Sequence, residues 1–315
     1  MTKICAAVDL GGTTVKIGLI TDAGEILEKW EIPTRKEENG SKILPDIATS
    51  VREHVEARKM KVTDLCGAGI GVPGPVQNNG VVERCVNLGW GETNPEKELS
   101  KMLDGILVKA GNDANVAALG EQWMGGGKGF DSLMMYTLGT GVGGGLIYQG
   151  HIVTGYKGMA AEVGHMPMNL DEEDACNCGG HGCLEQYASA TGIVKEMKRT
   201  LTAGGVNSRL SLDSEFSCKD VLDAAKDGDE AATKTMERCM KYLAASMASV
   251  SYVADPEVFV IGGGVSKAGN YLVDMVKKYF RGYCMLMKAM PEFKLATLGN
   301  DAGMFGSARL VFLEA

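Results

Sequence analysis

DLGGTTVKIGLI at residues 9–20 and LGTGVGGGLIYQG at residues 138–150 share one pattern. In each, a strand enters a Gly- and Thr-rich turn and a second strand leaves it. Two copies so far apart in one chain indicate an internal duplication. Strands and helices alternate through the rest of the sequence, which is typical of an α/β fold. The sequence therefore predicts two related α/β halves, each with one such hairpin.

Both turns have the composition of a phosphate-binding turn. Glycine lets backbone N–H groups approach phosphate oxygens, and threonine hydroxyls add donors. Asp9, at the end of the first strand, is a candidate ligand of Mg²⁺. Taken alone, the first turn is equally well explained as a plain β-turn beside a strand-end carboxylate. The two turns together favour a shared nucleotide, with these candidate contacts: Gly11, Gly12, Thr13, Thr14, Thr140, Gly141, Gly143 and Gly144.

A second informative stretch is EVGHMPMNLDEEDACNCGGHGCLE at residues 162–185. Cys176, Cys178 and Cys183 offer three thiolates within one short loop, and His165 offers an imidazole upstream of it. Three cysteines and one histidine are the ligand set of a closed tetrahedral zinc site of the structural kind. Glycines in the loop let the backbone turn tightly enough for the sulfurs to reach one ion. This spacing predicts a structural Zn²⁺ ion.

Two alternatives accompany the zinc prediction. The cysteines are free thiols in the simpler interpretation, because an isolated cysteine usually packs as a small apolar residue. His181, inside the loop, competes with His165 for the fourth ligand position, although its short reach favours His165. Glu162 and Glu185 flank the loop. Our hypothesis is that the metal is a scaffold and that these carboxylates and His165 face a substrate.

Hydrophobic periodicity predicts the remaining elements. In the first half it predicts strands at 3–10, 15–20, 24–34, 65–72, 81–90 and 106–111, and helices at 41–59 and 116–123. In the second half it predicts strands at 132–139, 257–261 and 293–299, and helices at 184–201, 217–228, 230–254, 270–283 and 303–315. The methionine stripe of helix 230–254 is predicted to pack in the core.

Three further positions follow predicted strands. Asp113 follows strand 106–111, and ligands of open α/β sheets bind at the carboxyl ends of strands. Asp113 is therefore a candidate general base for a hydroxyl group, or it simply caps the next helix. Asn87 and Trp90 are candidates for sugar contact. In the alternative interpretation, Asn87 is buried with its hydrogen bonds satisfied within the protein, and Trp90 packs in the core. Three glycines, 262–264, leave room for a flat base or a phosphate after strand 257–261.

Composition limits the class of protein. A chain of 315 residues with 45% hydrophobic and 23% charged residues is typical of about two globular domains. The net charge of −8 and the lack of a basic patch give no electrostatic support for nucleic-acid binding. No apolar run reaches the length of a membrane span. Nine cysteines, and a predicted strand by Ile4 with no signal peptide before it, lead us to expect a reducing, cytoplasmic location.

Six motifs occur in one order along nearly the whole chain: D-L-G-G-T, N-D-A-N-x-A-A-L-G-E, L-G-T-G-V-G-G-G, E-x-G-H, C-x-C-G-x-x-G-C-L-E and I-G-G-G-V. Together they resemble the ROK family of sugar kinases and repressors, and within it the bacterial glucokinases of Gram-positive type. The resemblance implies an actin-like ATPase (ribonuclease H-like) fold, with two α/β domains around a deep cleft. It implies a smaller domain at 1–113 plus 301–315 and a larger one, with the zinc loop, at 114–300.

The resemblance also implies a function, namely an ATP- and Mg²⁺-dependent kinase for the 6-hydroxyl of glucose, with a homodimer expected. Asp113 would be the catalytic base. His165 would bind zinc through one ring nitrogen and face the sugar with the other. The implied sugar contacts are Gly74, Asn87, Asn112, Asp113, Glu162, His165 and Glu185. The implied contacts of ATP and its metal are Asp9, Gly11, Gly12, Thr13, Thr14, Lys16, Thr140, Gly141, Gly262, Gly263 and Gly264.

Alternatives remain at this stage. Kinases for N-acetylmannosamine, N-acetylglucosamine or another hexose share the scaffold and differ in the pocket wall. Polyphosphate or ADP could replace ATP without an obvious mark in the sequence. A sugar-responsive repressor is disfavoured, because the first strand begins almost at Met1, which leaves no room for a DNA-binding helix-turn-helix, and because the net charge is negative. A sugar-binding regulator without catalysis is disfavoured because the candidate base, the phosphate turns and the metal loop are all intact.

Overall fold

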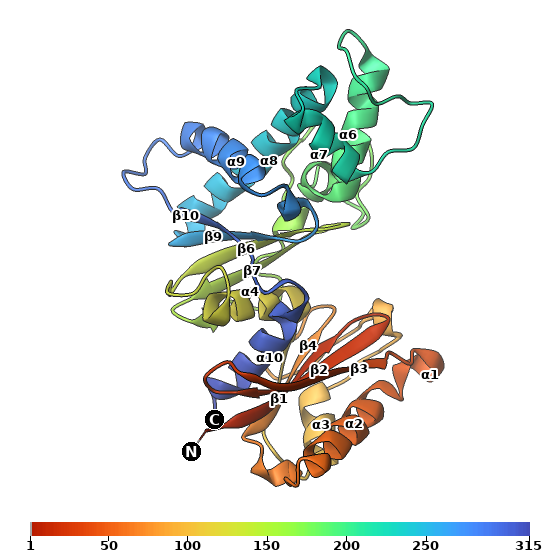
Figure 1. Cartoon of the computed structure of the whole chain (residues 1–315), viewed down its shortest axis with the longest axis vertical. Helices are drawn as coiled ribbons and strands as arrows, with labels where there is room; N and C mark the ends of the chain where they lie inside the picture. The colour runs from red at the N-terminus through yellow and green to blue at the C-terminus, as the bar shows by residue number, and fades with distance from the viewer. Residues whose placement is uncertain (1) are drawn as a thin grey trace. The chain divides into compact units, whose positions relative to one another are not determined.

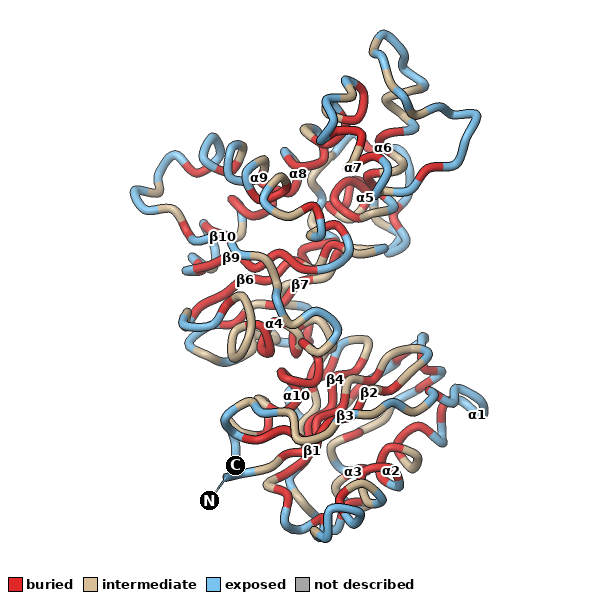
Figure 2. Tube along the Cα trace, viewed as in Figure 1, coloured by how far each residue is buried: buried red, intermediate tan, exposed pale blue. Residues whose placement is uncertain are grey.

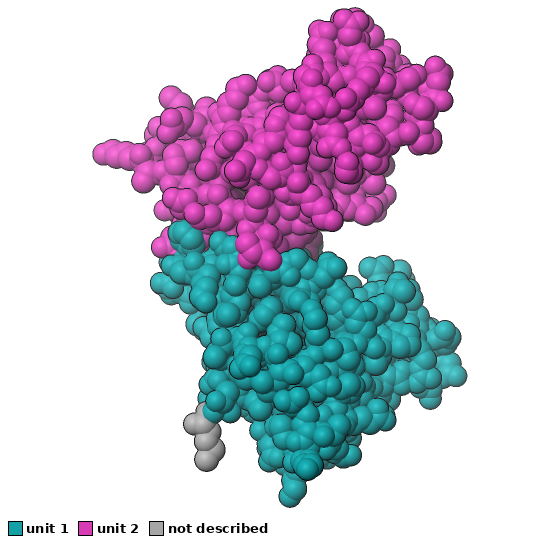
Figure 3. Space-filling model, viewed as in Figure 1, with its two compact units in different colours: residues 1–131, 145–161, 298–315 teal, residues 132–144, 162–297 magenta. Residues whose placement is uncertain are grey.

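The computed structural model describes residues 2–315 and divides the chain into two compact units, which Figure 3 colours separately. The first unit comprises residues 1–131, 145–161 and 298–315, and the second comprises residues 132–144 and 162–297. The domain boundaries implied by the resemblance, 1–113 plus 301–315 and 114–300, stay a prediction.

The first sheet has the strand order β3-β2-β1-β4-β5. β1 pairs antiparallel with β2 and parallel with β4, and β4 pairs parallel with β5. The carboxyl ends of β1, β4 and β5 therefore meet at one edge of the sheet. The strands are β1 (Ile4–Leu10), β2 (Thr14–Thr21), β3 (Ile26–Pro33), β4 (Gly67–Val72) and β5 (Val108–Asn112).

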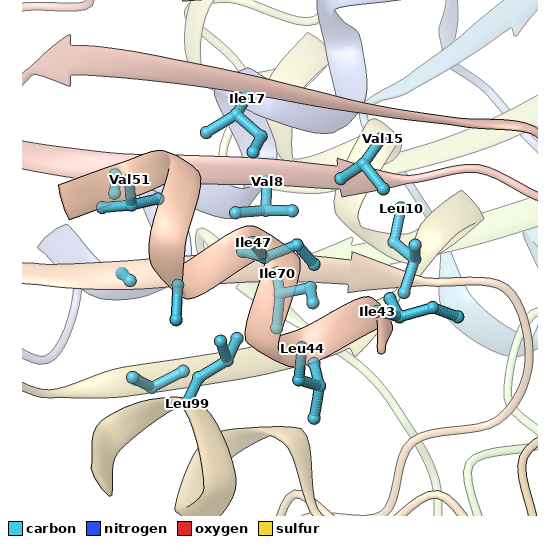
Figure 4. Close-up of a cluster of buried hydrophobic side chains, with 14 of the residues drawn as sticks. Val8, Leu10, Val15, Ile17, Ile43, Leu44, Ile47, Val51, Ile70 and Leu99 are labelled. Atoms are coloured by element: carbon cyan, nitrogen blue, oxygen red, sulfur yellow. The ribbon is translucent and has the colours of Figure 1, made fainter. Parts of the chain in front are cut away.

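Helices cover both faces of this sheet, with α2 and α3 on one face and α10 on the other (Figure 1). Side chains alternate between the faces of a strand, so Val8 and Leu10 meet the apolar stripe of α2 in one core (Figure 4). On the opposite face Ala7 and Ile20 pack with residues of α10. The helices of this unit are α1 (Glu37–Gly40), α2 (Ile43–Ala57), α3 (Pro95–Met102), α4 (Asp113–Met124) and α10 (Ala302–Phe312).

Glycines let α10 approach its neighbours closely. A Cβ on Gly69 of β4 would lie 1.8 Å from the carbonyl oxygen of Ser307. A Cβ on Gly306 would lie 1.7 Å from the carbonyl oxygen of Val116 in α4. Such distances exclude any side chain, so these two glycines are required by packing.

The second sheet has the order β10-β9-β6-β7-β8. Read from β8, this is the same arrangement as the first sheet read from β3, and the parallel pairs β6–β9 and β9–β10 match β1–β4 and β4–β5. The repeated order agrees with the predicted duplication. The strands are β6 (Leu133–Leu138), β7 (Val142–Tyr148), β8 (His151–Ile152), β9 (Val258–Gly262) and β10 (Glu292–Leu295).

The helices of the second unit are α5 (Glu185–Ala188), α6 (Ala190–Ala203), α7 (Cys218–Lys226), α8 (Glu230–Ala254) and α9 (Asn270–Tyr283). α8 and α9 have the bounds that the hydrophobic pattern predicts. Met236, Met240 and Met247 of α8 are fully buried, which confirms that the methionine stripe is core. The connection between α6 and α7 is exposed along most of its length (Figure 2).

Two predicted elements are wrong. Residues 81–90 form no strand; they make the isolated bridges Val82–Thr93 and Cys85–Trp90 around a short 3₁₀ helix, Val86–Leu88, which ends at Gly89 with φ +76°. The predicted helix 184–201 breaks at Ser189. That residue is extended (φ −75°, ψ 164°), and its hydroxyl accepts the Gly192 N–H as the N-cap of α6. Within residues 2–315 no helix combines the length and the apolar character needed to cross a bilayer.

Candidate active site

Two carboxylates lie at the strand-end edge of the first sheet. Asp9 is the penultimate residue of β1, and Asp113 is the first residue of α4, directly after β5. Burial raises the pKa of Asp9, the Lys16 ammonium 4.0 Å away opposes this rise, and the charge of Asp113 adds to it. A Cβ on Gly303 of α10 would lie 2.6 Å from the Asp9 Cγ. The structure thus brings Asp9 and Asp113 together, with α10 against the Asp9 carboxylate.

The β1–β2 turn is held by its own backbone. The Gly11 N–H donates to the Thr14 carbonyl at 3.1 Å, and the Thr34 hydroxyl donates to the Gly11 carbonyl at 2.7 Å. A Cβ on Gly11 would lie 2.8 Å from the Thr14 oxygen, whereas a Cβ on Gly12 would meet nothing within 4 Å in the described chain. Packing therefore requires glycine at position 11 and does not require it at position 12.

Asn112, and not Asp113, caps α4. The Asn112 side chain accepts the N–H groups of Ala114 and Asn115 at 3.1 Å each, and its amide donates to the Gly74 carbonyl at 3.0 Å. The alternative role given to Asp113, that of N-cap, is therefore wrong. Asp113 instead lies in the first turn, where the N–H of Ala114 donates to its carboxylate at 2.8 Å and the helix dipole favours its charge.

The loop at 81–93 lies beside these groups. The Cys85 thiol donates to the Pro73 carbonyl at 2.6 Å, and burial raises its pKa, with Asp113 adding to the rise. Asn87 is exposed in the 3₁₀ helix of this loop. Trp90 is buried and donates its indole N–H to the Gly40 carbonyl at 3.2 Å. It is therefore a core tryptophan, as the second of its two interpretations has it.

In the second unit β6 and β9 are parallel neighbours, and the glycines that follow them meet at one edge. Gly263 has φ +83°, and a Cβ there would lie 2.5 Å from the Leu138 carbonyl oxygen, so packing requires glycine. Gly264 has φ −61°, and a Cβ there would meet nothing within 4 Å in the described chain. The exposed Thr140 accepts the Thr191 hydroxyl at its carbonyl, at 2.7 Å.

Glu185 connects this edge with the cysteine loop. One carboxylate oxygen accepts the Val142 N–H at 2.9 Å, and the other lies 3.8 Å from the Cys176 Sγ. A Cβ on Gly141 would lie 2.2 Å from the same carboxylate. Gly164, between Glu162 and His165, packs equally closely, because its Cβ would lie 2.0 Å from the Val142 carbonyl oxygen. The E-x-G-H segment and Glu185 therefore both pack against the turn at 140–142.

His165, Cys176, Cys178 and Cys183 form a cluster whose candidate ligand atoms all lie within 4.8 Å of one another. The Sγ atoms of Cys178 and Cys183 are 3.6 Å apart. A tetrahedron with Zn–S bonds of about 2.3 Å has sulfur–sulfur edges of about 3.8 Å, close to this separation. His181 is exposed and forms a short bridge with Ala175. The geometry favours His165 as the fourth ligand.

The surroundings of the cysteine loop shift the pKa values of its thiols. Burial, together with the neighbouring thiols, raises the pKa of Cys183 to about 12. The N–H of Gly180 donates to the Cys178 Sγ at 3.4 Å and lowers the pKa of that thiol. A divalent cation would relieve the repulsion among three thiolates, so the donor set fits a bound metal.

An ionic network joins α6 to residues 172–174, directly before the cysteines, and the sequence did not predict it. The Glu172 carboxylate accepts both terminal nitrogens of Arg199 at 2.7 Å and the Tyr187 hydroxyl at 2.5 Å. Arg199 also donates to Asp174 and Glu196. This pairing holds the pKa of Glu172 well below its usual range. The E-x-x-R spacing from Glu196 to Arg199 was the only signal in the sequence, and it does not indicate Glu172.

Comparisons with known proteins agree with this description. The sequence profile of the ROK family matches residues 5–313. A glucokinase from Halalkalibacterium halodurans is 41% identical over 310 residues, which cover 96% of this chain and 93% of that protein. A ROK hexokinase from Thermus thermophilus superposes with a TM-score of 0.82 at 28% identity, over 100% of this chain and 99% of that one. A ROK family glucokinase from Streptomyces griseus, in complex with glucose and AMPPNP, has a TM-score of 0.73 at 31% identity, over 98% of each chain.

Arg199→Met keeps the apolar stem of the side chain and removes the charge that faces Glu172. We expect the unfolding free energy at pH 7 to fall by about 3 kcal/mol, the lower end for a buried ion pair, because the Arg199 side chain is 34% exposed. The pKa of Glu172 is depressed in the folded protein, so the ion pair stabilises the fold fully above the ordinary glutamate pKa of about 4.3. The difference in unfolding free energy between wild type and variant should therefore be largest above this pH and should become smaller as the pH falls below it. Urea denaturation at several pH values measures the effect.

The matched control is Arg281→Met on the exposed surface of α9. Equal loss of stability in the two variants, or a loss in Arg199→Met that does not change with pH, would contradict the role of the Glu172–Arg199 pair.

Proposed function

The chain belongs to the ROK family, and from this premise we propose that it is an ATP-dependent kinase that phosphorylates the 6-hydroxyl of glucose. The observation that carries the proposal is the pair of carboxylates, Asp9 and Asp113, at one strand-end edge beside a glycine turn. The choice of glucose rests on the relatives, a glucokinase at 41% identity and a glucokinase whose structure contains glucose and AMPPNP.

Asp113 is the general base in this proposal. Its carboxylate takes the proton of the sugar 6-hydroxyl as that oxygen attacks the γ-phosphorus. The bond between the γ-phosphorus and the oxygen that bridges it to the β-phosphate breaks, and ADP leaves. The position of Asp113 in the first turn of α4 suits this role, because the helix N-terminus stabilises the charged form that accepts the proton.

The glycine turns are proposed to hold the phosphates of ATP. Gly12 and Gly264 support this role, since neither packing nor a positive φ requires glycine at either position, and a phosphate can approach the open backbone. Asp9, with Lys16 beside it, is proposed to face the Mg²⁺ that accompanies ATP. Thr13, Thr14 and the residues around Thr140 complete the proposed nucleotide contacts.

Glu162 and His165 are proposed to bind the sugar hydroxyls. Both lie in a segment that Gly164 holds close to the backbone of Val142, which limits their freedom and suits precise positioning. Glu185 is proposed to act at the same sugar, although its carboxylate already accepts the Val142 N–H. In the first unit, Asn112 and the Gly74 carbonyl are joined by a hydrogen bond and are proposed, with Asn87, as further sugar contacts.

A structural Zn²⁺ ion is proposed at His165, Cys176, Cys178 and Cys183. The support is the closeness of the four ligand atoms and the sulfur–sulfur distance of 3.6 Å. The ion would supply a fixed tetrahedral junction for a loop that has little regular secondary structure, so metal binding would contribute directly to folding.

Asp113→Asn should keep sugar binding and lose turnover. Removal of a general base lowers kcat by about 10²- to 10⁴-fold, and the amide has nearly the size and shape of the carboxylate. A coupled ADP-release assay with Mg·ATP gives kcat, and calorimetry gives glucose affinity. Asp274→Asn on the exposed face of α9 is the control. Turnover in Asp113→Asn close to that of the control would refute the base assignment.

Zinc should be bound at about one ion per chain and should stabilise the second unit. We expect His165→Ala and Cys178→Ala to lose the metal, measured by elemental analysis, and to melt at a lower temperature. His181→Ala is the matched control, because this histidine is in the same loop and outside the cluster. Unchanged melting of the purified protein after chelation would count against a structural metal.

Glucose should have the highest kcat/KM in a panel with mannose, fructose, N-acetylglucosamine and N-acetylmannosamine. If an N-acetylated sugar is preferred, the kinase mechanism stands, and the pocket wall near Glu185 accommodates an acetamido group instead of the 2-hydroxyl. If no sugar stimulates ADP release, the proposed kinase activity is wrong.

A further inference from the structure

Glu121, the last residue of the N-D-A-N-x-A-A-L-G-E motif, has no role in the functions proposed above. It lies near the end of α4 and is completely buried. A carboxylate is costly to bury unless hydrogen bonds replace the water that it loses. The hydrogen bonds that Glu121 makes inside the fold therefore indicate what the residue does.

Both oxygens of the Glu121 carboxylate accept backbone N–H groups from other segments. Oε1 accepts the N–H of Leu298 at 2.9 Å, and Oε2 accepts the N–H of Gly126 at 2.7 Å. A Cβ on Gly125 would lie 2.0 Å from Oε2, so the glycine loop packs directly on the carboxylate. One side chain thus joins the end of α4 to the loop that follows it and to the segment before α10.

Leu298 begins the last stretch of the first unit, residues 298–315. It precedes a short 3₁₀ helix, Gly299–Asp301, and then α10. Asp301 is the N-cap residue of α10, but its side chain makes no capping hydrogen bond and pairs instead with Lys29 at 2.9 Å. The hydrogen bond from Leu298 to Glu121 therefore fixes the chain just before α10 begins.

The residues directly after Leu298 contact the groups proposed to face Mg²⁺ and the phosphates. The Asn300 carbonyl accepts the Lys16 ammonium at 3.2 Å. Gly303 lies against the Asp9 carboxylate, because a Cβ there would lie 2.6 Å from the Asp9 Cγ. A movement of this segment would therefore change the surroundings of both Lys16 and Asp9.

We propose that Glu121 is a positioning residue for nucleotide binding. By holding the N–H of Leu298, it sets where the start of α10 meets Asp9 and Lys16. The inference rests on the proposed ATP-dependent function, and it adds a buried residue that touches neither the nucleotide nor the sugar. Glu121 acts on the affinity for Mg·ATP and not on the proton transfer to Asp113.

Glu121→Gln tests the proposal. It keeps the size of the side chain but replaces one acceptor oxygen with an NH₂ group, which cannot accept an N–H. We expect the Kd of Mg·AMPPNP, measured by calorimetry, to rise about tenfold, which corresponds to about 1.4 kcal/mol. The KM for Mg·ATP should rise by a similar factor, whereas the KM for glucose should stay close to that of the wild type.

Glu96→Gln in α3 is the matched control. Glu96 is also a glutamate of the first unit that accepts a backbone N–H, that of Ala110 at 2.9 Å, and a Cβ on Gly80 would lie 2.5 Å from its carboxylate. We expect this variant to unfold at a lower urea concentration than the wild type and to bind Mg·AMPPNP with unchanged affinity. The control thereby separates a general loss of stability from a loss of nucleotide binding.

Leu298→Pro provides a second variant in case Glu121→Gln does not fold. It removes the N–H that Glu121 accepts, and φ at Leu298 is −79°, a value that proline adopts. Leu298→Ala is its control, because alanine loses the leucine side chain and keeps the N–H. We expect weaker binding of Mg·AMPPNP in Leu298→Pro than in Leu298→Ala.

The proposal is overturned if folded Glu121→Gln binds Mg·AMPPNP as tightly as the wild type, or if Leu298→Pro and Leu298→Ala bind it equally well. Either result would leave the proposed kinase activity standing. A wild type that binds no Mg·AMPPNP would refute the ATP-dependent function together with this inference, so the two failures are distinguishable.

Discussion

The hydrogen bond from the Val142 N–H to the Glu185 carboxylate joins the glycine turn after β6 to the end of the cysteine loop. The other carboxylate oxygen lies 3.8 Å from the Cys176 sulfur. Gly141 packs directly against the Glu185 carboxylate, because a Cβ there would lie 2.2 Å from it. A shift of the cysteine loop therefore shifts the turn after β6 as well. For this reason the geometry of the proposed phosphate turn depends on whether the cysteine loop is correctly folded.

The cysteine loop has two supports of different kinds. On one side, burial and then the neighbouring thiols raise the pKa of Cys183, which disfavours the thiolate form of the cluster unless a cation balances its charge. On the other side, Arg199 pairs with Glu172 and draws Asp174 to α6. The ionic support is present at neutral pH without any metal. The proposed ion would thus complete a loop that hydrogen-bonded ion pairs already position, as groups behind metal ligands commonly do.

Strong periodicity made the long elements predictable. α8 and α9 begin and end where the apolar pattern does, and the repeated hairpin predicted the repeated strand order of the two sheets. Close cysteine spacing predicted which side chains would gather. The break at Ser189 was hidden because alanine, a strong helix former, stands on either side of it, and the side-chain bond to the Gly192 N–H reveals the cap. Residues 81–90 are rich in valine, which favours a strand, yet they form only isolated bridges.

Contacts between side chains far apart in the chain could not be predicted from local sequence patterns. Arg199 meets Glu172 across 27 positions, and no local pattern connects them. The same limit applies to Asn112 and Asp113, since either residue type caps a helix well and only the fold shows which one does so.

Glycine motifs combine two physical demands that the sequence cannot separate. Gly11 and Gly263 are needed because a Cβ would collide with the protein's own backbone, and a Cβ on Gly141 would displace the Glu185 carboxylate. Gly12 and Gly264 adjoin them in the same motifs, but their Cβ positions are open and their φ angles are accessible to any residue. A glycine that the fold does not need, at the end of a parallel strand, is best explained by something outside the fold. The open positions, more than the motif as a whole, therefore carry the argument for a bound phosphate.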